Sequence, residues 1–128
     1  MGTIVKGPSV KRILLVDDDV ALLGLLREWL VSAGHSVVSL SDFHAAKNYL
    51  ALNIPDMIVT DVRLGAYNGL QLAISAKTAH PDVVTIVLTG FDDNVIRADA
   101  AAAGAHYLVK PVIETDFLRF VRASFQGS

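Results

Sequence analysis

Six residues with reactive or charged side chains directly follow short apolar runs of the sequence. They are Asp17, Asp18, Asp19, Asp61, Thr89 and Lys110. Carboxylate oxygens without cysteine or paired histidine favour Mg²⁺ or Mn²⁺ over Zn²⁺ as a bound ion. A hydroxyl, an ammonium group and a hard metal ion around one carboxylate are the groups that phosphoryl transfer requires. The sequence therefore predicts phosphoryl chemistry if these residues meet in space.

Such a group of carboxylates is costly unless cations neutralise it. Two unit charges about 5 Å apart repel by about 3 kcal/mol at an effective dielectric constant of about 20. A purely structural role does not explain why several aspartates would share one location. A divalent cation among the carboxylates and the ammonium group of Lys110 beside them would offset the repulsion.

The elements that must position these residues alternate along the chain as strands and helices, which is typical of βα units around a parallel sheet. We predict strands over Ile13–Val16, Ser36–Leu40, Met57–Thr60, Val83–Leu88 and Tyr107–Val109. We predict helices over about Asp19–Ala33, Asp42–Leu52, Gly69–Ala79, Asp92–Ala103 and Glu114–Ser124. Because parallel strands joined by right-handed crossovers point the same way, their carboxyl ends share one edge. The reactive residues follow four of the five strands and should meet there.

Local signals at the helix ends support these boundaries. Asp19, Asp42 and Asp92 are suitable N-cap residues, and Gly34 is a suitable residue just past the end of the first helix. Helical spacing predicts that one face of this helix packs on the core, through Leu22, Leu26, Trp29 and Leu30. The histidines, His35, His44, His80 and His106, are scattered without metal-ligand spacing, which favours ordinary surface roles.

Length and composition limit the class of protein. The 128 residues correspond to about one domain, which we place at residues 11–125 between flexible tails at 1–10 and 126–128. The absence of cysteine excludes a disulfide scaffold and a thiolate zinc site. A net charge of −2 without a long basic run argues against direct nucleic-acid binding. With no signal-peptide pattern and no apolar stretch long enough to span a membrane, we expect a cytoplasmic protein without membrane contact.

Four segments around the reactive residues resemble one protein family in order and spacing. They are ILLVDDD at 13–19, MIVTDVRL at 57–64, IVLTGFDD at 86–93 and AGAHYLVKPV at 103–112. Together they resemble the receiver domain of two-component response regulators. The resemblance covers about Lys11 to Phe125 and implies a flavodoxin-like, doubly wound α/β sandwich. This (βα)5 fold has a five-stranded parallel sheet in the order 2-1-3-4-5.

The resemblance also implies a role for each site residue. Asp61 would be the phosphoacceptor, and Asp17 and Asp18 would bind Mg²⁺ or Mn²⁺ together with Asp61 and the backbone carbonyl of Arg63. Lys110 would pair with the bound phosphoryl group. Asp19 lies outside the metal-binding pair and would cap the first helix.

Two further positions match the family's switch residues, and one departs from the family pattern. Thr89 would bond the phosphoryl group, and Tyr107 would be the aromatic switch residue. The Lys110–Pro111 bond matches one that is usually cis in the family, whereas such bonds are generally cis in only about 5–6% of cases. Gly65 stands where many members have proline, so we expect an altered and more mobile loop there.

The expected function is a phosphorylation-controlled signalling switch that catalyses only its own phosphorylation and dephosphorylation and is not otherwise an enzyme. The resemblance implies that a sensor histidine kinase or histidine phosphotransfer protein donates the phosphoryl group in a phosphorelay. A downstream effector or dimer partner would bind through the fourth helix, fifth strand and fifth helix.

Three alternatives compete with this reading. The first is a small aspartate-nucleophile phosphatase resembling the haloacid dehalogenase superfamily, although Lys110 follows the last acidic pair instead of preceding it. The second is an interaction domain that is not phosphorylated. The third is a flavodoxin-like nucleotide carrier, which the three aspartates after the first strand disfavour.

Overall fold

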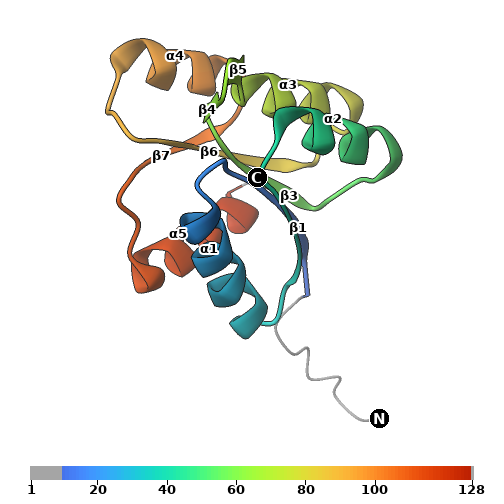
Figure 1. The fold of residues 1–128 in the computed structure, drawn as a ribbon, viewed down its shortest axis with the longest axis vertical. Helices are drawn as coiled ribbons and strands as arrows, with labels where there is room; N and C mark the ends of the chain where they lie inside the picture. The colour runs from blue at the N-terminus through green and yellow to red at the C-terminus, as the bar shows by residue number, and fades with distance from the viewer. Residues whose placement is uncertain (1–9, 128) are drawn as a thin grey trace.

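The chain folds around a five-stranded parallel sheet in a computed structural model that describes residues 10–127. The strands are β1 (Arg12–Val16), β2 (Ser36–Leu40), β3 (Met57–Asp61), β6 (Val84–Thr89) and β7 (His106–Val109). They lie in the order β2-β1-β3-β6-β7 (Figure 1). Because two short strands interrupt the numbering after β3, this is the predicted order 2-1-3-4-5. The flavodoxin-like α/β fold is confirmed.

Five helices cover both faces of the sheet. Helices α1 (Val20–Ser32) and α5 (Glu114–Gln126) lie together on one face. Helices α2 (Phe43–Leu52), α3 (Leu70–Ala79) and α4 (Asn94–Ala102) lie on the other face (Figure 1). Within residues 10–127, the helices fall short of the length and apolar character that crossing a membrane requires.

The strands are apolar throughout because both of their faces are covered. In β1, Ile13 and Leu15 pack into the core under α1 and α5, whereas Leu14 and Val16 pack into the core under α2 and α3. The first core also holds Phe117, which is 1% exposed. Burial of each large apolar side chain stabilises the fold by about 1.5–3 kcal/mol. The buried strands therefore hold the backbone of the residues at their ends in place.

The helix boundaries follow local capping, with one correction. Asp19 accepts a hydrogen bond from the Leu22 N–H at 3.1 Å, and Asp42 caps α2 in the same way. Gly34 follows α1 with a φ of +97°, as expected for a residue after a helix end. The prediction that Asp92 caps the next helix was wrong. Asp93 caps α4, because it directly precedes the first helical residue and its carboxylate accepts the N–H groups of Val95 and Ile96, whereas Asp92 pairs with Arg97.

The buried face of α1 and the end of α5 also differ from the sequence prediction. The buried face of α1 is formed by Leu23, Leu26 and Leu30, while Leu22 and Trp29 pack at the margin of the core. Helix α5 continues to Gln126, so the predicted tail at 126–128 began too early. The predicted tail at 1–10 lies, apart from Val10, outside the described residues.

A short hairpin follows β3 and was not predicted. It pairs β4 (Arg63–Leu64) with β5 (Tyr67–Asn68) in antiparallel register. The connecting Gly65 has a φ of +62°, which glycine adopts without steric cost. A proline at this position could not adopt a positive φ. The expected change of loop geometry is therefore a hairpin, and its mobility stays a prediction.

Gly69, at the start of α3, offers a test of how closely this helix approaches β3. A Cβ atom there would overlap the Asp61 carbonyl oxygen and lie 2.6 Å from Thr60 Oγ1. We expect G69A to lower the free energy of unfolding by about 1–3 kcal/mol, measured by urea denaturation. The matched control is G24A in the exposed part of α1, where nothing lies within 4 Å of the added methyl group. The control should stabilise the protein by about 0.5–1 kcal/mol, and equal effects of both variants would contradict the close approach.

Candidate functional site

Three aspartates form an acid cluster at the carboxyl edge of the sheet. Asp17 and Asp18 directly follow β1, and Asp61 is the last residue of the neighbouring strand β3. One carboxylate oxygen of each lies within 4.8 Å of the others. Asp17 is 1% exposed and Asp61 is 6% exposed, whereas Asp18 faces solvent. The structure therefore brings together the three acidic side chains that the sequence placed at this edge.

Lys110, directly after β7, reaches into the acid cluster. Its Nζ atom lies 2.9 Å from Asp17 Oδ2 and 3.4 Å from Asp61 Oδ2. The Lys110–Pro111 peptide bond is cis, the geometry that the resemblance implied. Although burial lowers the pKa of Lys110, the hydrogen bond to Asp17 and the charges of both aspartates raise it above its usual value. The lysine therefore remains an ammonium group.

The pKa of Asp61 is raised as well, which for a carboxyl group favours the neutral form. Burial raises the pKa of Asp61, and the nearby charge of Asp17 raises it further. The charge and hydrogen bond of Lys110 and the backbone N–H of Arg63 partly offset this increase. The Asp61 carboxylate is thus a partly desolvated group whose negative charge is incompletely balanced.

The donor set of the acid cluster fits a hard divalent cation. Asp17 Oδ1 accepts the Asp19 N–H at 2.9 Å. Asp17 Oδ2 is buried, and apart from its ion pair with Lys110 it accepts no well-formed hydrogen bond from the described residues. Oxygen ligands and spare negative charge are what Mg²⁺ and Mn²⁺ select. Arg63, whose carbonyl the resemblance implied as a ligand, lies in β4 two residues beyond Asp61.

Thr89 and Tyr107, the two predicted switch residues, bond to the same backbone carbonyl. Thr89 ends β6, beside β3, and its hydroxyl donates to the Phe91 carbonyl oxygen at 3.1 Å. Tyr107, on edge strand β7, donates its hydroxyl to the same oxygen at 3.2 Å. The Tyr107 hydroxyl also accepts the Asp93 N–H at 3.0 Å. The loop between β6 and α4 therefore holds both side chains.

Sequence analysis missed two residues that hold Tyr107. The Arg97 guanidinium lies over the Tyr107 ring, 4.6 Å from its centre, and pairs with Asp92 at 2.6 Å. The Tyr107 hydroxyl also approaches Asp92 Oδ1 at 3.4 Å. We call Asp92, Arg97 and Tyr107 the outer latch. No sequence motif marks it, because Tyr107 belongs to a different element from the other two residues.

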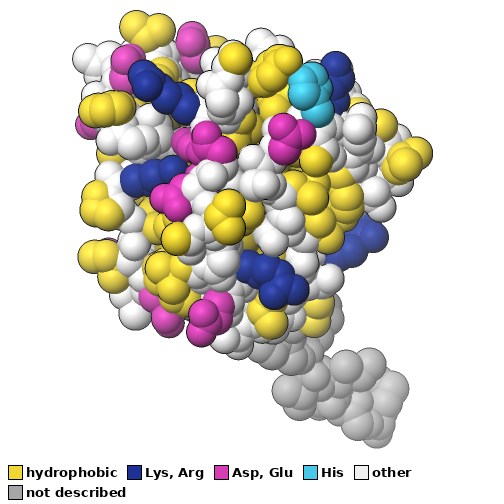
Figure 2. All heavy atoms as spheres, in the orientation of Figure 1, with side chains coloured by type: hydrophobic (Ala, Val, Ile, Leu, Met, Phe, Trp, Pro, Cys, Tyr) yellow, Lys and Arg dark blue, Asp and Glu magenta, His cyan; other side chains and the backbone are white. Residues whose placement is uncertain are grey.

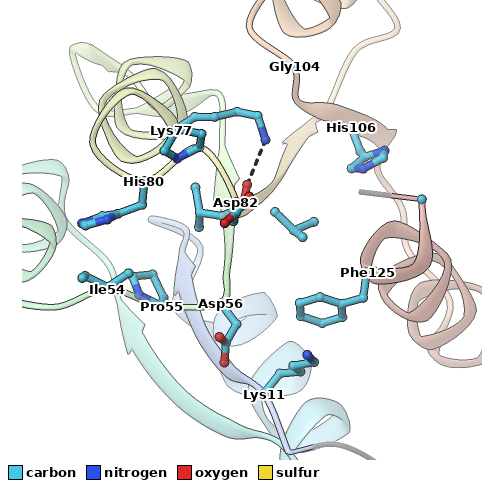
Figure 3. Close-up of a pocket in the computed structure, with 14 residues that line it drawn as sticks. Lys11, Ile54, Pro55, Asp56, Lys77, His80, Asp82, Gly104, His106 and Phe125 are labelled. Atoms are coloured by element: carbon cyan, nitrogen blue, oxygen red, sulfur yellow. Dashed lines mark hydrogen bonds between the residues drawn. The ribbon is translucent and has the colours of Figure 1, made fainter.

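The histidines and the largest described cavity lie apart from the acid cluster. The cavity, of about 710 Å³, is lined at the amino ends of the strands by residues that include His80, His106 and Phe125 (Figure 3). One of its cations is already engaged, because Lys77 Nζ donates to the Val83 carbonyl oxygen at 2.9 Å. His44 packs edge-on against Tyr67. Burial lowers the pKa of His35, and the charge of Lys11 lowers it further.

Charges of both signs are mixed over the surface. On the face drawn in Figure 2, lysine and arginine side chains of the described residues are separated by acidic and apolar ones. The expectation that the chain does not bind nucleic acid directly stays a prediction.

The raised pKa of Asp61 predicts that D61N stabilises the protein at neutral pH without divalent cations. A group whose folded-state pKa is raised contributes stability below its unfolded pKa and loses it as pH rises through the folded pKa. The asparagine variant avoids this loss, so its free energy of unfolding should rise on the order of 1 kcal/mol. The gain should vanish below the ordinary Asp pKa of 3.8.

Urea denaturation in EDTA, at neutral pH and at a pH below 3.8, checks this prediction, with the exposed D116N as control. Lower stability of D61N at neutral pH would refute it.

The chain matches the family model described as response regulator receiver domain over residues 13–122. It is 36% identical over 113 residues to the alginate biosynthesis transcriptional regulatory protein AlgB of Pseudomonas aeruginosa, covering 88% of this chain and 25% of AlgB. It is also 36% identical over 113 residues to the response regulator MprA of a Mycobacterium species, covering 88% of this chain and 49% of MprA. The chain thus spans between a quarter and a half of the length of these relatives.

A solved structure agrees in fold. A CheY-like response regulator receiver domain protein from Methanospirillum hungatei superposes with a TM-score of 0.87 at 27% identity. The match covers 93% of this chain and 96% of that chain. Because the family model matches residues 13–122, most of the chain, the chain belongs to the family of response regulator receiver domains.

Proposed function

We propose that this receiver domain is switched by phosphorylation of Asp61, with Asp17, Asp18, Thr89, Lys110 and Tyr107 in the roles that the family resemblance implied. The observation that carries the proposal is the position of the Lys110 ammonium, within 3.4 Å of both Asp17 and Asp61. An ammonium group beside a buried carboxylate is suited to neutralising a phosphoryl group bound to that carboxylate. The proposed domain spans residues 11–125.

The proposed donor is a phosphohistidine on a sensor histidine kinase or histidine phosphotransfer protein. An Asp61 oxygen attacks the phosphorus, an O–P bond forms, and the P–N bond breaks. The imidazole leaves with the electron pair of that bond and takes up a proton. Desolvation of Asp61 favours the reaction, because a carboxylate with little water around it is a better nucleophile. Hydrolysis of the resulting acyl phosphate resets the domain.

The acid cluster is the proposed cation site. Asp17, Asp18 and Asp61 with the carbonyl of Arg63 would hold Mg²⁺ or Mn²⁺, which supplies positive charge beside the phosphoryl oxygens when bound. Lys110 supplies charge on the other side. Phosphoryl transfer needs aligned reactants and neutralised charge, and the acid cluster together with the lysine would provide both.

The shared Phe91 carbonyl suggests how phosphorylation is transmitted. A phosphoryl group on Asp61 offers the Thr89 hydroxyl a charged acceptor, which makes a stronger hydrogen bond than a neutral carbonyl. When Thr89 turns towards it, the loop from Phe91 to Asp93 loses one of its contacts, and Tyr107 is free to move inward. Shifting a 1:99 equilibrium to 99:1 requires about 5.5 kcal/mol of differential stabilisation.

The proposed output surface comprises α4, β7 and α5, where a downstream effector or a second receiver domain would bind. It includes the outer latch, so movement of Tyr107 changes it directly. The relatives named above are a transcriptional regulatory protein and a response regulator, each longer than this chain. We place the domain in the cytoplasm, where phosphohistidine donors of this class act. The haloacid dehalogenase alternative has no support in these matches.

Phosphorylation of Asp61 can be tested with a small-molecule donor. Incubation of the chain with acetyl phosphate and Mg²⁺ should add the mass of one phosphoryl group, detected by intact mass spectrometry. The adduct should be absent from D61N and fall at least tenfold with excess EDTA, because nucleophile and cation are both required. The matched control is D116N, which removes an exposed carboxylate on α5 and should be labelled like the wild type. An equal yield from D61N would rule out this phosphoacceptor.

The outer latch predicts a shift of the unphosphorylated population. R97A removes both the ring contact and the ion pair that restrain Tyr107. Because both contacts are exposed and weak, we expect at most a few-fold rise in the population with Tyr107 turned inward, measured by NMR exchange of its ring signals. The control is R119A, which removes an exposed ion pair with Asp116 on α5. Identical Tyr107 exchange in both variants would contradict the latch.

A further inference from the structure

We propose that Tyr67, stacked on Phe43, is a positioning residue that holds the β4–β5 hairpin against the acid cluster and so sets the affinity for a divalent cation. The two aromatic rings lie 4.7 Å apart with an interplanar angle of 9°. Both residues lie outside the reactive groups described above. This inference rests on the proposed function, since it concerns the cation site assigned there.

The hairpin cannot hold its own shape. Each of its strands contributes only two residues, and the turn between them contains Gly65 with a φ of +62°. Isolated two-stranded hairpins are marginally stable at best, even when they are longer than this one. Contacts with the rest of the domain must therefore fix the position of β4 and β5.

Side chains from both strands anchor the hairpin. Leu64 of β4 is 3% exposed and packs into the core under α2 and α3. Tyr67 of β5 is 46% exposed, and its ring stacks on Phe43 while His44 meets it edge-on at 4.7 Å. Asn68, the other residue of β5, accepts the Leu70 N–H at 2.9 Å, so its side chain contacts the first residue of α3. The outer strand of the hairpin thus depends on the stack of Tyr67 with Phe43.

The same hairpin contacts two of the three aspartates of the acid cluster. The backbone N–H of Arg63 lies beside the Asp61 carboxylate and offsets part of the rise in its pKa, and the N–H of Gly65 approaches Asp18 Oδ2 at 3.4 Å. Hydrogen bonds from N–H groups to carboxylates are stronger than those between neutral groups and fix the carboxylate orientation. Any displacement of β4 and its turn therefore changes how Asp61 and Asp18 face each other.

Loss of the stack should weaken cation binding more than it weakens the fold. A cation site binds tightly when its ligands are already oriented, and ordering them on binding lowers the affinity. An aromatic pair is worth the equivalent of roughly a two- to tenfold change in an equilibrium constant. Because Tyr67 lies at the edge of the domain and is half exposed, its removal leaves the buried cores intact.

The test is calorimetric titration of MgCl₂ into the full chain and five variants, with the metal-free unfolding free energy measured alongside. We expect Y67A to raise the Mg²⁺ dissociation constant roughly two- to tenfold and Y67F to restore the wild-type value. F43L should act like Y67A, and the double variant should be no weaker than either alone, because both remove one stack. The matched control is F125A, which removes an aromatic ring at the amino edge of the sheet and should leave the Mg²⁺ affinity unchanged.

A measurement without metal tests whether the stack of Tyr67 on Phe43 holds the hairpin. In EDTA, amide hydrogen exchange at Arg63 and Gly65 should be faster in Y67A than in Y67F by a similar two- to tenfold factor. Equal exchange in the two variants, or equal Mg²⁺ affinity of wild type and Y67A, would overturn this inference alone. Failure of the wild type to bind Mg²⁺ would overturn the proposed cation site and this inference with it.

Discussion

The position of the Lys110 ammonium between Asp17 and Asp61 is the constraint on which the site depends. The nearly buried carboxylates of Asp17 and Asp61, with oxygen atoms within 4.8 Å of each other, repel. Among the described residues, the lysine provides the balancing charge. The three side chains come from the ends of β1, β3 and β7, which are far apart in the chain. They can meet only because every strand of the sheet runs in the same direction. The parallel sheet therefore makes the charge balance possible.

Rigid and adjustable parts of the site are built differently. Asp61 and Thr89 are the last residues of β3 and β6, whose other residues are buried, so their backbones are firmly held. The contacts of Thr89 and Tyr107 with the Phe91 carbonyl lie in a loop, where hydrogen bonds exchange more readily with alternatives. Such a division would give the proposed reacting oxygen of Asp61 little freedom and leave the proposed switch residues free to move.

Sequence reasoning identified what periodicity and strand direction determine. The five-stranded order and the meeting of Asp17, Asp61 and Lys110 follow from repeated βα units and a common strand direction. The choice of Asp93 over Asp92 as a cap did not follow, because both are good caps and the sequence does not fix the residue at which α4 begins. The hairpin after β3 was also missed, because two-residue strands leave no periodic pattern.

Several contacts that sequence could not reveal join residues that are distant in the chain. Tyr67 stacks on Phe43, and Arg63 of the same hairpin lies over the Phe91 ring at 5.8 Å. Phe91 in turn supplies the carbonyl that Thr89 and Tyr107 share. A cation–π contact at such exposed positions is worth about 0.5–1 kcal/mol, far less than the burial of the strands. Weak contacts can therefore adjust the surroundings of Asp61 without endangering the fold.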